Sequence, residues 1–470
     1  MGFIKLLTIL AIFIPQIAAA DNSILVSIDN PKFRQMVIAT PGLIVDDSED
    51  DDIIKTASWA PKYLRSILNY SGLFKNISEI AYQDLMKKIS ARSKKGQEEG
   101  GSLITPTDLR HWKTIGVEAL IIGKVISDDG GMTLELRTVD INRGKTILGK
   151  RYRNVKVSEL TLVMRRYGNL ILEAFTGKPG IFSSKIVFVG RKTKGTAKQI
   201  FYCDFDGSNV KQITNADAPH LSPHWSPDGK FITFTSYERK NPDLYLYEVA
   251  TGKRRLISGY AGLNSGAQWA PNGKLVAYTG SVRGNSDIYM LNPFSGGRKR
   301  LISGHGLDVD PTFSPNGKYL AFVSGRFGNP HIFLGTLAWN GTQSVRVTSD
   351  RRLTYAGWYN STPAWDPSSQ KIVFAGYDKD INRYDIFIMQ YDGKQLERLT
   401  LQTGDNESPT FSPNGQMIAF QSNRMGISNI KSRPQLFTMD RDGSNQRKLD
   451  VGLYEAHTPS WSGPLYTTSK

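Results

Sequence analysis

The chain contains a single cysteine, Cys203, among its 470 residues. One thiol cannot form an internal disulfide, and it also excludes any metal site that is built from several cysteines. Because Cys203 lies within a predicted strand, we interpret it as a packing residue and not as a catalytic nucleophile. We therefore expect no disulfide scaffold, no metal centre and no cofactor.

Long basic runs and long apolar runs are also absent. The net charge of +16, from 59 Lys and Arg against 43 Asp and Glu, favours acidic partners or anionic surfaces. The basic residues never form a run of five or more, so we expect no nucleic-acid partner. No segment approaches the roughly 18 apolar residues that predict a membrane-spanning helix.

Residues 1–20 have the features of a signal peptide. Lys5 precedes the apolar stretch 6–14, and a group of alanines follows it. At about 1.5 Å per residue this stretch is too short for ~30 Å of hydrocarbon, which disfavours the alternative of a membrane anchor. We expect cleavage between Ala20 and Asp21 and an exported protein.

Residues 21–32 then form a predicted extended segment. Its apolar residues Ile24, Val26 and Ile28 alternate with other positions, as in a strand. Such a segment suits addition to the sheet edge of a partner protein. The alternative is an internal edge strand of the following domain.

Residues 33–180 mix predicted strands and helices, which indicates a small α/β domain. The acidic run 48–52 is interpreted as the first turn of a helix, where acids suit the helix dipole, and not as a metal site. The first predicted element is a strand at 36–45, with Pro41-Gly42 as a bend or edge. The others are helices at 53–68 and 80–91, a short helix at 107–112, a strand at 119–125, a hairpin at 132–139 and 147–155, and a helix at 159–175.

A turn phrase recurs in the C-terminal part of the chain. It consists of an aromatic residue, one further residue and proline, followed in most copies by Asp-Gly or Asn-Gly. The copies begin at Trp225, Trp269, Phe313, Trp365 and Phe411, with a truncated sixth at Trp461. Their spacing runs from 44 residues (225 to 269) to 52 residues (313 to 365). Strand-bearing repeats of roughly 40–50 residues are typical of propeller blades.

The chemistry of the phrase predicts its place in a blade. Glycine supplies the positive φ of a reverse turn, and the aromatic side chain fills the wedge between neighbouring blades. Three predicted strands follow each of the five complete phrases, and one further set at 185–214 precedes the first, which gives six blades. The predicted fold class is multidomain, with an N-terminal α/β domain at 33–180 and an all-β six-bladed propeller at 181–470.

Polar residues shortly before each phrase are candidates for a protein-binding rim. We expect them in loops at one end of the axial channel, where the blades converge. Alternatively, each residue only caps its own turn, and a solvated rim is favoured over a metal role for the two histidines. The candidates are His220, Asn264, Asp308, Asp310, Asn360, Glu407, Glu455 and His457.

Phrases outside the repeats resemble the TolB family of the Tol–Pal system. They are Tyr-Ser-Gly-Leu-Phe at 70–74, Gly-Val-Glu-Ala-Leu-Ile-Ile-Gly at 116–123, and Thr-Gly-Lys-Pro-Gly-Ile-Phe at 176–182 before the strand at 185–189. Together with the leader and the repeats, the resemblance covers essentially the whole chain. The sequence departs from the family pattern in its dense acidic run, in the longer repeat through 341–359, and at Gly463, where other copies have proline.

The resemblance implies a monomeric periplasmic scaffold and no enzymatic activity. Family members bind Pal, an outer-membrane lipoprotein, at one propeller face, and TolA, an inner-membrane protein, through the mature N-terminal strand. These coupled events serve outer-membrane integrity and constriction during cell division. The rim residues would be the Pal-type contacts. The matching TolA-type contacts are Asp21, Asn22, Ile24, Val26, Ile28 and Asp29.

Two other functions remain open from the sequence. Prolyl-oligopeptidase-type peptidases have similar propeller turns, but they also need a Gly-x-Ser-x-Gly elbow, and this sequence has no such pentapeptide. A stand-alone propeller that binds a sugar or cell-wall polymer is the second alternative. Deletion of 21–32 would distinguish it, because such a protein would keep all of its binding.

Overall fold

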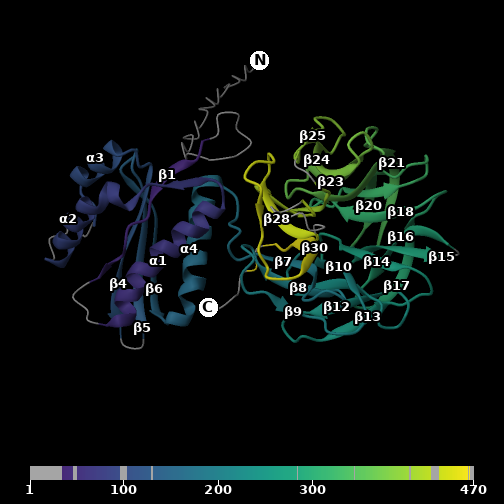
Figure 1. The fold of residues 1–470 in the computed structure, drawn as a ribbon, viewed down its shortest axis with the longest axis horizontal. Helices are drawn as coiled ribbons and strands as arrows, with labels where there is room; N and C mark the ends of the chain where they lie inside the picture. The colour runs from purple at the N-terminus through teal and green to yellow at the C-terminus, as the bar shows by residue number, and fades with distance from the viewer. Residues whose placement is uncertain are drawn as a thin grey trace, which may run out of the picture.

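The structure, a computed structural model, consists of two domains that lie side by side (Figure 1). An α/β domain takes the first part of the chain and a ring of β-sheets takes the rest, which confirms the predicted fold class. The predicted signal peptide 1–20 and the predicted strand 21–32 lie outside the described residues. The described residues are 34–45, 50–95, 103–128, 131–282, 284–342, 344–401, 404–424, 433–463 and 465.

The N-terminal domain is built on one mixed sheet. Its strands are β1 (Met36–Ala39), β2 (Ile44–Val45), β3 (Phe74–Asn76), β4 (Ala119–Asp128), β5 (Gly131–Asp140) and β6 (Lys145–Val155). The order is β3-β1-β4-β5-β6, and β2 pairs with β4. The bend predicted at Pro41-Gly42 lies in the segment that separates β1 from β2, so the region 36–45 forms two short strands in place of one. Proline lacks the N–H that a continuous ladder needs.

Helices cover both faces of this sheet. They are α1 (Asp51–Tyr70), η1 (Glu79–Tyr82), α2 (Gln83–Lys94), α3 (Pro106–Thr114), η2 (Val157–Glu159) and α4 (Leu160–Thr176). Side chains of α1 and α4 pack into one core, and those of α2 and α3 into a second. Asp50 caps α1 by accepting the backbone N–H of Asp52 at 2.8 Å, which confirms that the acidic run begins a helix. The helix continues through Pro61.

Six four-stranded antiparallel sheets form the propeller. Blade 1 contains β10 (His220–Trp225), β11 (Phe231–Ser236), β12 (Asp243–Glu248) and β13 (Arg254–Ser258). Blade 2 contains β14 (Asn264–Trp269), β15 (Val276–Val282), β16 (Asn285–Asn292) and β17 (Gly296–Ile302). Blade 3 contains β18 (Asp308–Phe313), β19 (Tyr319–Ser324), β20 (His331–Asn340) and β21 (Ser344–Arg352).

The remaining blades follow the same order. Blade 4 contains β22 (Tyr359–Trp365), β23 (Lys371–Asp378), β24 (Arg383–Gln390) and β25 (Glu397–Arg398). Blade 5 contains β26 (Asn406–Phe411), β27 (Met417–Ser422), β28 (Gln435–Asp440) and β29 (Arg447–Lys448). Blade 6 combines β30 (Glu455–Trp461) with β7 (Lys185–Arg191), β8 (Gln199–Asp204) and β9 (Lys211–Gln212).

Blade 6 closes the ring, because it joins the last strand of the chain to the first strands of the propeller. Strand β30 pairs antiparallel with β7. The backbone N–H of Ser462 donates to the carbonyl of Lys185 at 2.8 Å, and the N–H of Lys185 donates to Ser462 Oγ at 2.9 Å. The ring is thus held shut by hydrogen bonds between segments far apart in the sequence.

The repeated turn phrase joins the innermost strand of a blade to its second strand. In blade 1 the N–H of Gly229 donates to the carbonyl of Ser226 at 2.9 Å, and Gly229 has a φ of 68°. The preceding Trp225 is buried against Val187 and Tyr202 of blade 6. Both predicted roles of the phrase, the turn and the wedge, are confirmed.

Each blade has one strand more than was predicted. The prediction placed the residues before each phrase in a loop, whereas the structure forms the innermost strand there. Strand β10 reads His-Leu-Ser-Pro-His-Trp, and its ladder register shifts between Leu221 and His224. This bulge and the proline break the alternation by which a strand is recognised in a sequence.

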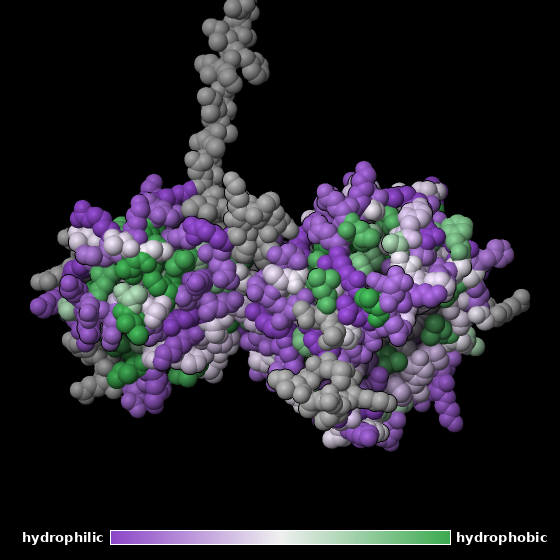
Figure 2. Space-filling view, turned by 45° about the horizontal axis from the view of Figure 1, so that its top comes forward, coloured by the Kyte–Doolittle hydropathy of each residue, from purple (hydrophilic) through white to green (hydrophobic). Residues whose placement is uncertain are grey.

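The two domains share a packed interface. The hydroxyl of Tyr70, at the end of α1, donates to the carbonyl of Phe205 at 3.0 Å. The Arg447 guanidinium of blade 5 lies 3.7 Å from the centroid of the Tyr70 ring. On α4, Arg165 pairs with Asp204 of blade 6 at 2.7 Å. Blades 5 and 6 thus anchor the α/β domain. Away from the interface, hydrophobic patches interrupt a mostly hydrophilic surface (Figure 2).

Candidate protein-binding channel of the propeller

The innermost strands of all six blades line one axial cavity of about 290 Å³. Each innermost strand ends in the aromatic residue of the turn phrase and contributes two residues to the wall. One stands three places before this aromatic residue, and the other stands immediately before the aromatic residue. The first set, which we call the bulge residues, consists of Ser222, Gly266, Asp310, Thr362, Ser408 and Thr458. The second set consists of His224, Gln268, Thr312, Ala364, Thr410 and Ser460. Because most of these side chains carry a hydroxyl, an amide or another polar group, the wall is polar.

The bulge residues share an uncommon backbone conformation. Five of them have φ between 48° and 52°, and Gly266 has 65°. The ladder register shifts at this place in every blade. Residues other than glycine rarely adopt positive φ, and such backbone persists only where its surroundings hold it, often at functional sites. The repeated bulge therefore fixes six side chains around the channel.

The channel carries little charge. Among its described lining residues, only Asp310 and His224 have ionisable side chains. Desolvation raises the pKa of Asp310, although its carboxylate accepts the backbone N–H of Thr362. Burial lowers the pKa of His224 to about 4, and Gln268 Nε2 lies 3.0 Å from its Nδ1. The histidine is therefore neutral at pH 7, and the wall carries at most one negative charge.

The eight predicted rim residues do not lie in loops, because all of them belong to the innermost strands. Four share one position, five residues before the aromatic residue, and are almost fully buried. These four are His220, Asn264, Asp308 and Asn360. His220 Nε2 lies 2.9 Å from Glu238 Oε1, and Asp308 accepts a hydrogen bond from Arg326 at 3.1 Å. His220 and Asp308 thus bind within their own blades, whereas Asn264 Oδ1 accepts from Ser258 of blade 1 at 2.7 Å and Asn360 Nδ2 lies 2.9 Å from His331 Nδ1 of blade 3.

The other four predicted residues occupy three further positions. Asp310 is the one predicted residue that lines the axial cavity. Glu407 and His457 lie four residues before the aromatic residue, and Glu455 lies six before it. Desolvation raises the pKa of Glu407, whereas burial lowers the pKa of His457 to about 3. The structure therefore does not bring the eight residues into a single ring.

The sequence did contain a signal for the channel wall that the prediction missed. A small or acidic residue stands three places before each aromatic residue, and in five blades proline follows it, as in Ser222-Pro223. Residues before proline avoid the right-handed α region, so this pair marks backbone that departs from helical geometry and not a turn cap. Apart from Asp310, the prediction named none of the twelve wall residues.

Family comparisons cover both parts of the chain. The model described as the TolB beta propeller domain matches residues 172–465, and the model described as the TolB amino-terminal domain matches residues 25–147.

The chain belongs to the TolB family.

Relatives in this family match over much of the chain. A Tol-Pal system protein TolB from Xanthomonas oryzae pv. oryzae (strain PXO99A) is 41% identical over 367 residues, which are 77% of this chain and 80% of the relative. The match to the TolB of Desulfosudis oleivorans is 33% identical and spans 51% of either chain. The crystal structure of TolB from Acinetobacter baumannii gives a TM-score of 0.72 at 26% identity and covers 92% of this chain and 97% of that one.

The described residues give no sign of a metal site or of a reactive thiol. The described residues contain no group of three or more His, Cys, Asp or Glu side chains placed to hold a metal ion. Cys203 is buried, and burial raises the pKa of its thiol, so it has the character of a packing residue. No helix in the described ranges combines the length and apolarity needed to cross a membrane.

Proposed function

We propose that the chain is a periplasmic scaffold of the Tol–Pal system that binds two proteins at separate places and catalyses no reaction. A Pal-like outer-membrane lipoprotein binds at the mouth of the propeller channel. A TolA-like inner-membrane protein binds residues 21–32. Coupling between the two partners serves outer-membrane integrity and constriction at cell division.

The polar wall of the axial cavity carries this proposal for the propeller. Six bulges present small or polar side chains on rigid strands, and binding sites commonly place a few polar groups on such a scaffold. Hydroxyl and amide groups suit hydrogen bonds to the exposed backbone of an inserted loop or helix end. Membership in the TolB family, whose relatives are named Tol-Pal system proteins, supports the choice of system.

Separate loss of the two partners tests the proposal. The mature chain, a variant lacking 21–32 and the variant Ala364→Arg would each capture proteins from an envelope extract for identification by mass spectrometry. Ala364 lines the cavity, so arginine there occupies space that a partner needs. The matched control is Ser349→Arg, which adds the same side chain on the exposed outer strand β21.

We expect the deletion to lose the TolA-like protein alone and Ala364→Arg to lose the Pal-like lipoprotein alone. Ser349→Arg should keep both partners. The two-partner scaffold is refuted when the deletion and Ala364→Arg both retain the full set of captured proteins. Circular dichroism and thermal melting must first show that each variant is folded.

A further inference from the structure

In blade 3 an arginine folds back over a pair of aromatic rings. Arg326 stands two residues after Ser324, the last residue of β19. Its Cζ lies 5.0 Å from the centroid of Phe333 and 5.6 Å from that of Phe322. Its Nε donates to Ser324 Oγ at 2.8 Å, and its Nη2 donates to Asp308 at 3.1 Å. The guanidinium thus fills the space between the innermost strand and the aromatic pair.

Blade 5 repeats this arrangement. Arg424 stands two residues after Ser422, and its Nε donates to Ser422 Oγ at 3.0 Å. Its Nη2 donates to Asn406 Oδ1 at 3.0 Å, and its Cζ lies 4.4 Å from the centroid of Phe437 and 5.5 Å from that of Phe420. Two blades therefore use the same three supports for a guanidinium, namely a hydroxyl, a polar side chain of the innermost strand and two aromatic faces.

Blade 4 has the aromatic pair and the polar side chain of the innermost strand, but it lacks both the hydroxyl and the arginine. In blade 4 Asn360 pairs with Gly376, and at the equivalent place in blade 5 Asn406 pairs with Ser422. Arg424 stands two residues after Ser422, so its equivalent in blade 4 stands two residues after Gly376, at position 378. The residue there is Asp378. Phe374 and Phe387 form the aromatic pair, with ring centroids 5.7 Å apart.

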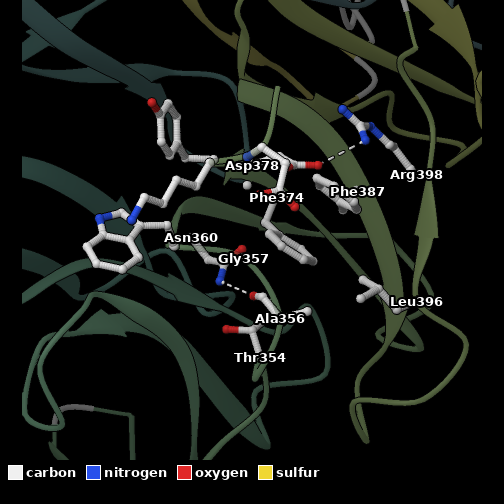
Figure 3. A pocket seen from close by; sticks show the side chains of 14 residues that line it. Thr354, Ala356, Gly357, Asn360, Phe374, Asp378, Phe387, Leu396 and Arg398 are labelled. Carbon is white, nitrogen blue, oxygen red and sulfur yellow. Dashed lines mark hydrogen bonds and ion pairs between the residues drawn. The ribbon is translucent and has the colours of Figure 1, made fainter. Parts of the chain in front are cut away.

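A pocket of about 380 Å³ opens over this aromatic pair (Figure 3). Figure 3 shows Asn360, Asp378 and Leu396 around it. In the described part of the chain no donor reaches Asn360 Oδ1, although its Nδ2 donates to the carbonyl of Ala356 at 2.9 Å. Gly376 adds no side chain to the space. Within the described residues, Asn360 Oδ1 therefore remains an acceptor without a donor in blade 4. At the equivalent place in blade 5, Asn406 Oδ1 accepts from Arg424.

Nearby charges and apolar groups define the walls. Arg398 contacts Asp378 at 3.3 Å, its Cζ lies 5.7 Å from the centroid of Phe387, and its other hydrogen bonds go to the buried Asp385. Lys379 also lines the pocket, with its Nζ 4.6 Å from the centroid of the Trp358 ring. Trp358 and Leu396 line the pocket and are 50% and 47% exposed, so the pocket opens to solvent beside apolar surface. The Phe374 ring, the Asn360 amide oxygen and a carboxylate that is shared with Arg398 thus face an entering group.

Blade 1 shows what an acidic residue does at this position. Glu238 stands two residues after Ser236, and it pairs with Arg254 from the outer strand of the same blade. An acid at this place therefore recruits an arginine from another segment. In blade 4 Arg398 pairs with Asp378 but also with the buried Asp385, so Asp378 shares its arginine with a second carboxylate and can accept from a further guanidinium.

We propose that the blade 4 pocket receives the side chain of an arginine from a partner protein. The guanidinium stacks on Phe374, donates to Asn360 Oδ1 and shares the carboxylate of Asp378 with Arg398. Arginine suits the pocket better than lysine, because its planar group both stacks and donates in several directions. The inference deepens the proposed function by naming a recognition element, and it rests on that function for the identity of the partner as a protein.

A titration with small probes tests the pocket without any partner. The mature chain would be titrated with N-acetyl-L-arginine amide, and with N-acetyl-L-lysine amide as the chemical control, by ligand-observed NMR. We expect weak saturable binding of the arginine probe and at least about tenfold weaker binding of the lysine probe.

Variants identify where the probe binds. Asp378→Arg should fill the pocket from within, as Arg326 and Arg424 do, so it should lose probe binding without a fall in melting temperature. Asp378→Asn keeps the shape and should weaken binding several-fold. Asp217→Arg, a charge reversal at an exposed residue of blade 1, should leave binding unchanged.

Equal binding to Asp378→Arg and the unmodified chain, no saturable binding, or equal binding of both probes would overturn the proposal. Because no partner takes part in the titration, this result is independent of the capture experiment. The pocket assignment can fail while the two-partner scaffold stands, and the reverse also holds.

Discussion

Replacing the wedge tryptophans by phenylalanine tests how the blades are held together. Phe313 and Phe411 fill this position in blades 3 and 5, so the repeat itself accepts the smaller ring. Trp225 and Trp461 are each 7% exposed at the equivalent place. Both Trp→Phe variants should therefore fold, and both should lose a similar amount of buried aromatic surface.

The indole N–H distinguishes the two sites. Trp461 Nε1 donates to Ser184 Oγ at 2.8 Å, whereas Trp225 Nε1 is buried and has no acceptor within the described ranges. The lost ring area costs about 1 kcal/mol at either site. Loss of the hydrogen bond adds about 1 kcal/mol for Trp461→Phe. Removal of an unsatisfied buried N–H returns about 1 kcal/mol for Trp225→Phe. The expected losses of stability are therefore ~2 and ~0 kcal/mol.

Thermal and urea unfolding of the mature chain would measure this difference. A difference of ~2 kcal/mol corresponds to about 4 °C in melting temperature for a domain of this size. Trp365, whose Nε1 donates to the carbonyl of Thr312 at 3.2 Å, should behave like Trp461. Trp269, whose Nε1 is buried without an acceptor in the described structure, should behave like Trp225. Equal losses at all four sites would refute the role given to the indole N–H.

Three further predictions concern protonation and the domain interface. His224 has a pKa of about 4 in the folded chain, against an ordinary value of 6.5. The stability of the fold should therefore decrease as the pH drops from about 6.5 to 4. The variant His224→Gln should flatten this dependence of the melting temperature on pH. Asp310→Asn should raise the melting temperature at pH 7, because the raised pKa of Asp310 means that its ionised form destabilises the folded chain; an unchanged value would contradict this. Gly72 has a φ of 72°, and a Cβ there would lie 2.8 Å from Asp440 Oδ1, so Gly72→Ala should cost ~3 kcal/mol in calorimetry. The control Gly116→Ala, with a φ of 83° and open space, should cost about 1 kcal/mol.

The prediction of the fold from the sequence succeeded where the signals are local and repeated. The turn from Ser226 to Gly229 depends on neighbouring residues, and a period of 44 to 52 residues repeats it around the ring. The start of α1 at Asp50 likewise depends on a cap within two residues. The innermost strands were missed because a bulge and a proline hide their alternation.

The candidate site was harder to predict because burial depends on strands that pair across the whole ring. His220 and Asp308 look like exposed polar residues in the sequence, yet both are buried and bind Glu238 and Arg326 inside their blades. Asp310 lies two residues after Asp308, and the bulge at its backbone directs it to the channel. Sequence spacing alone cannot separate these two environments.

The sequence by itself determined the kind of protein: a repeated turn phrase and wedge residue specify propeller blades through local backbone preferences and the burial of aromatic surface. Tertiary structure alone decided which polar residues line the channel and where a blade keeps an open pocket. Both features arise when strands distant in the chain pair in register, as β30 does with β7, because only then is it fixed which side chains face one another.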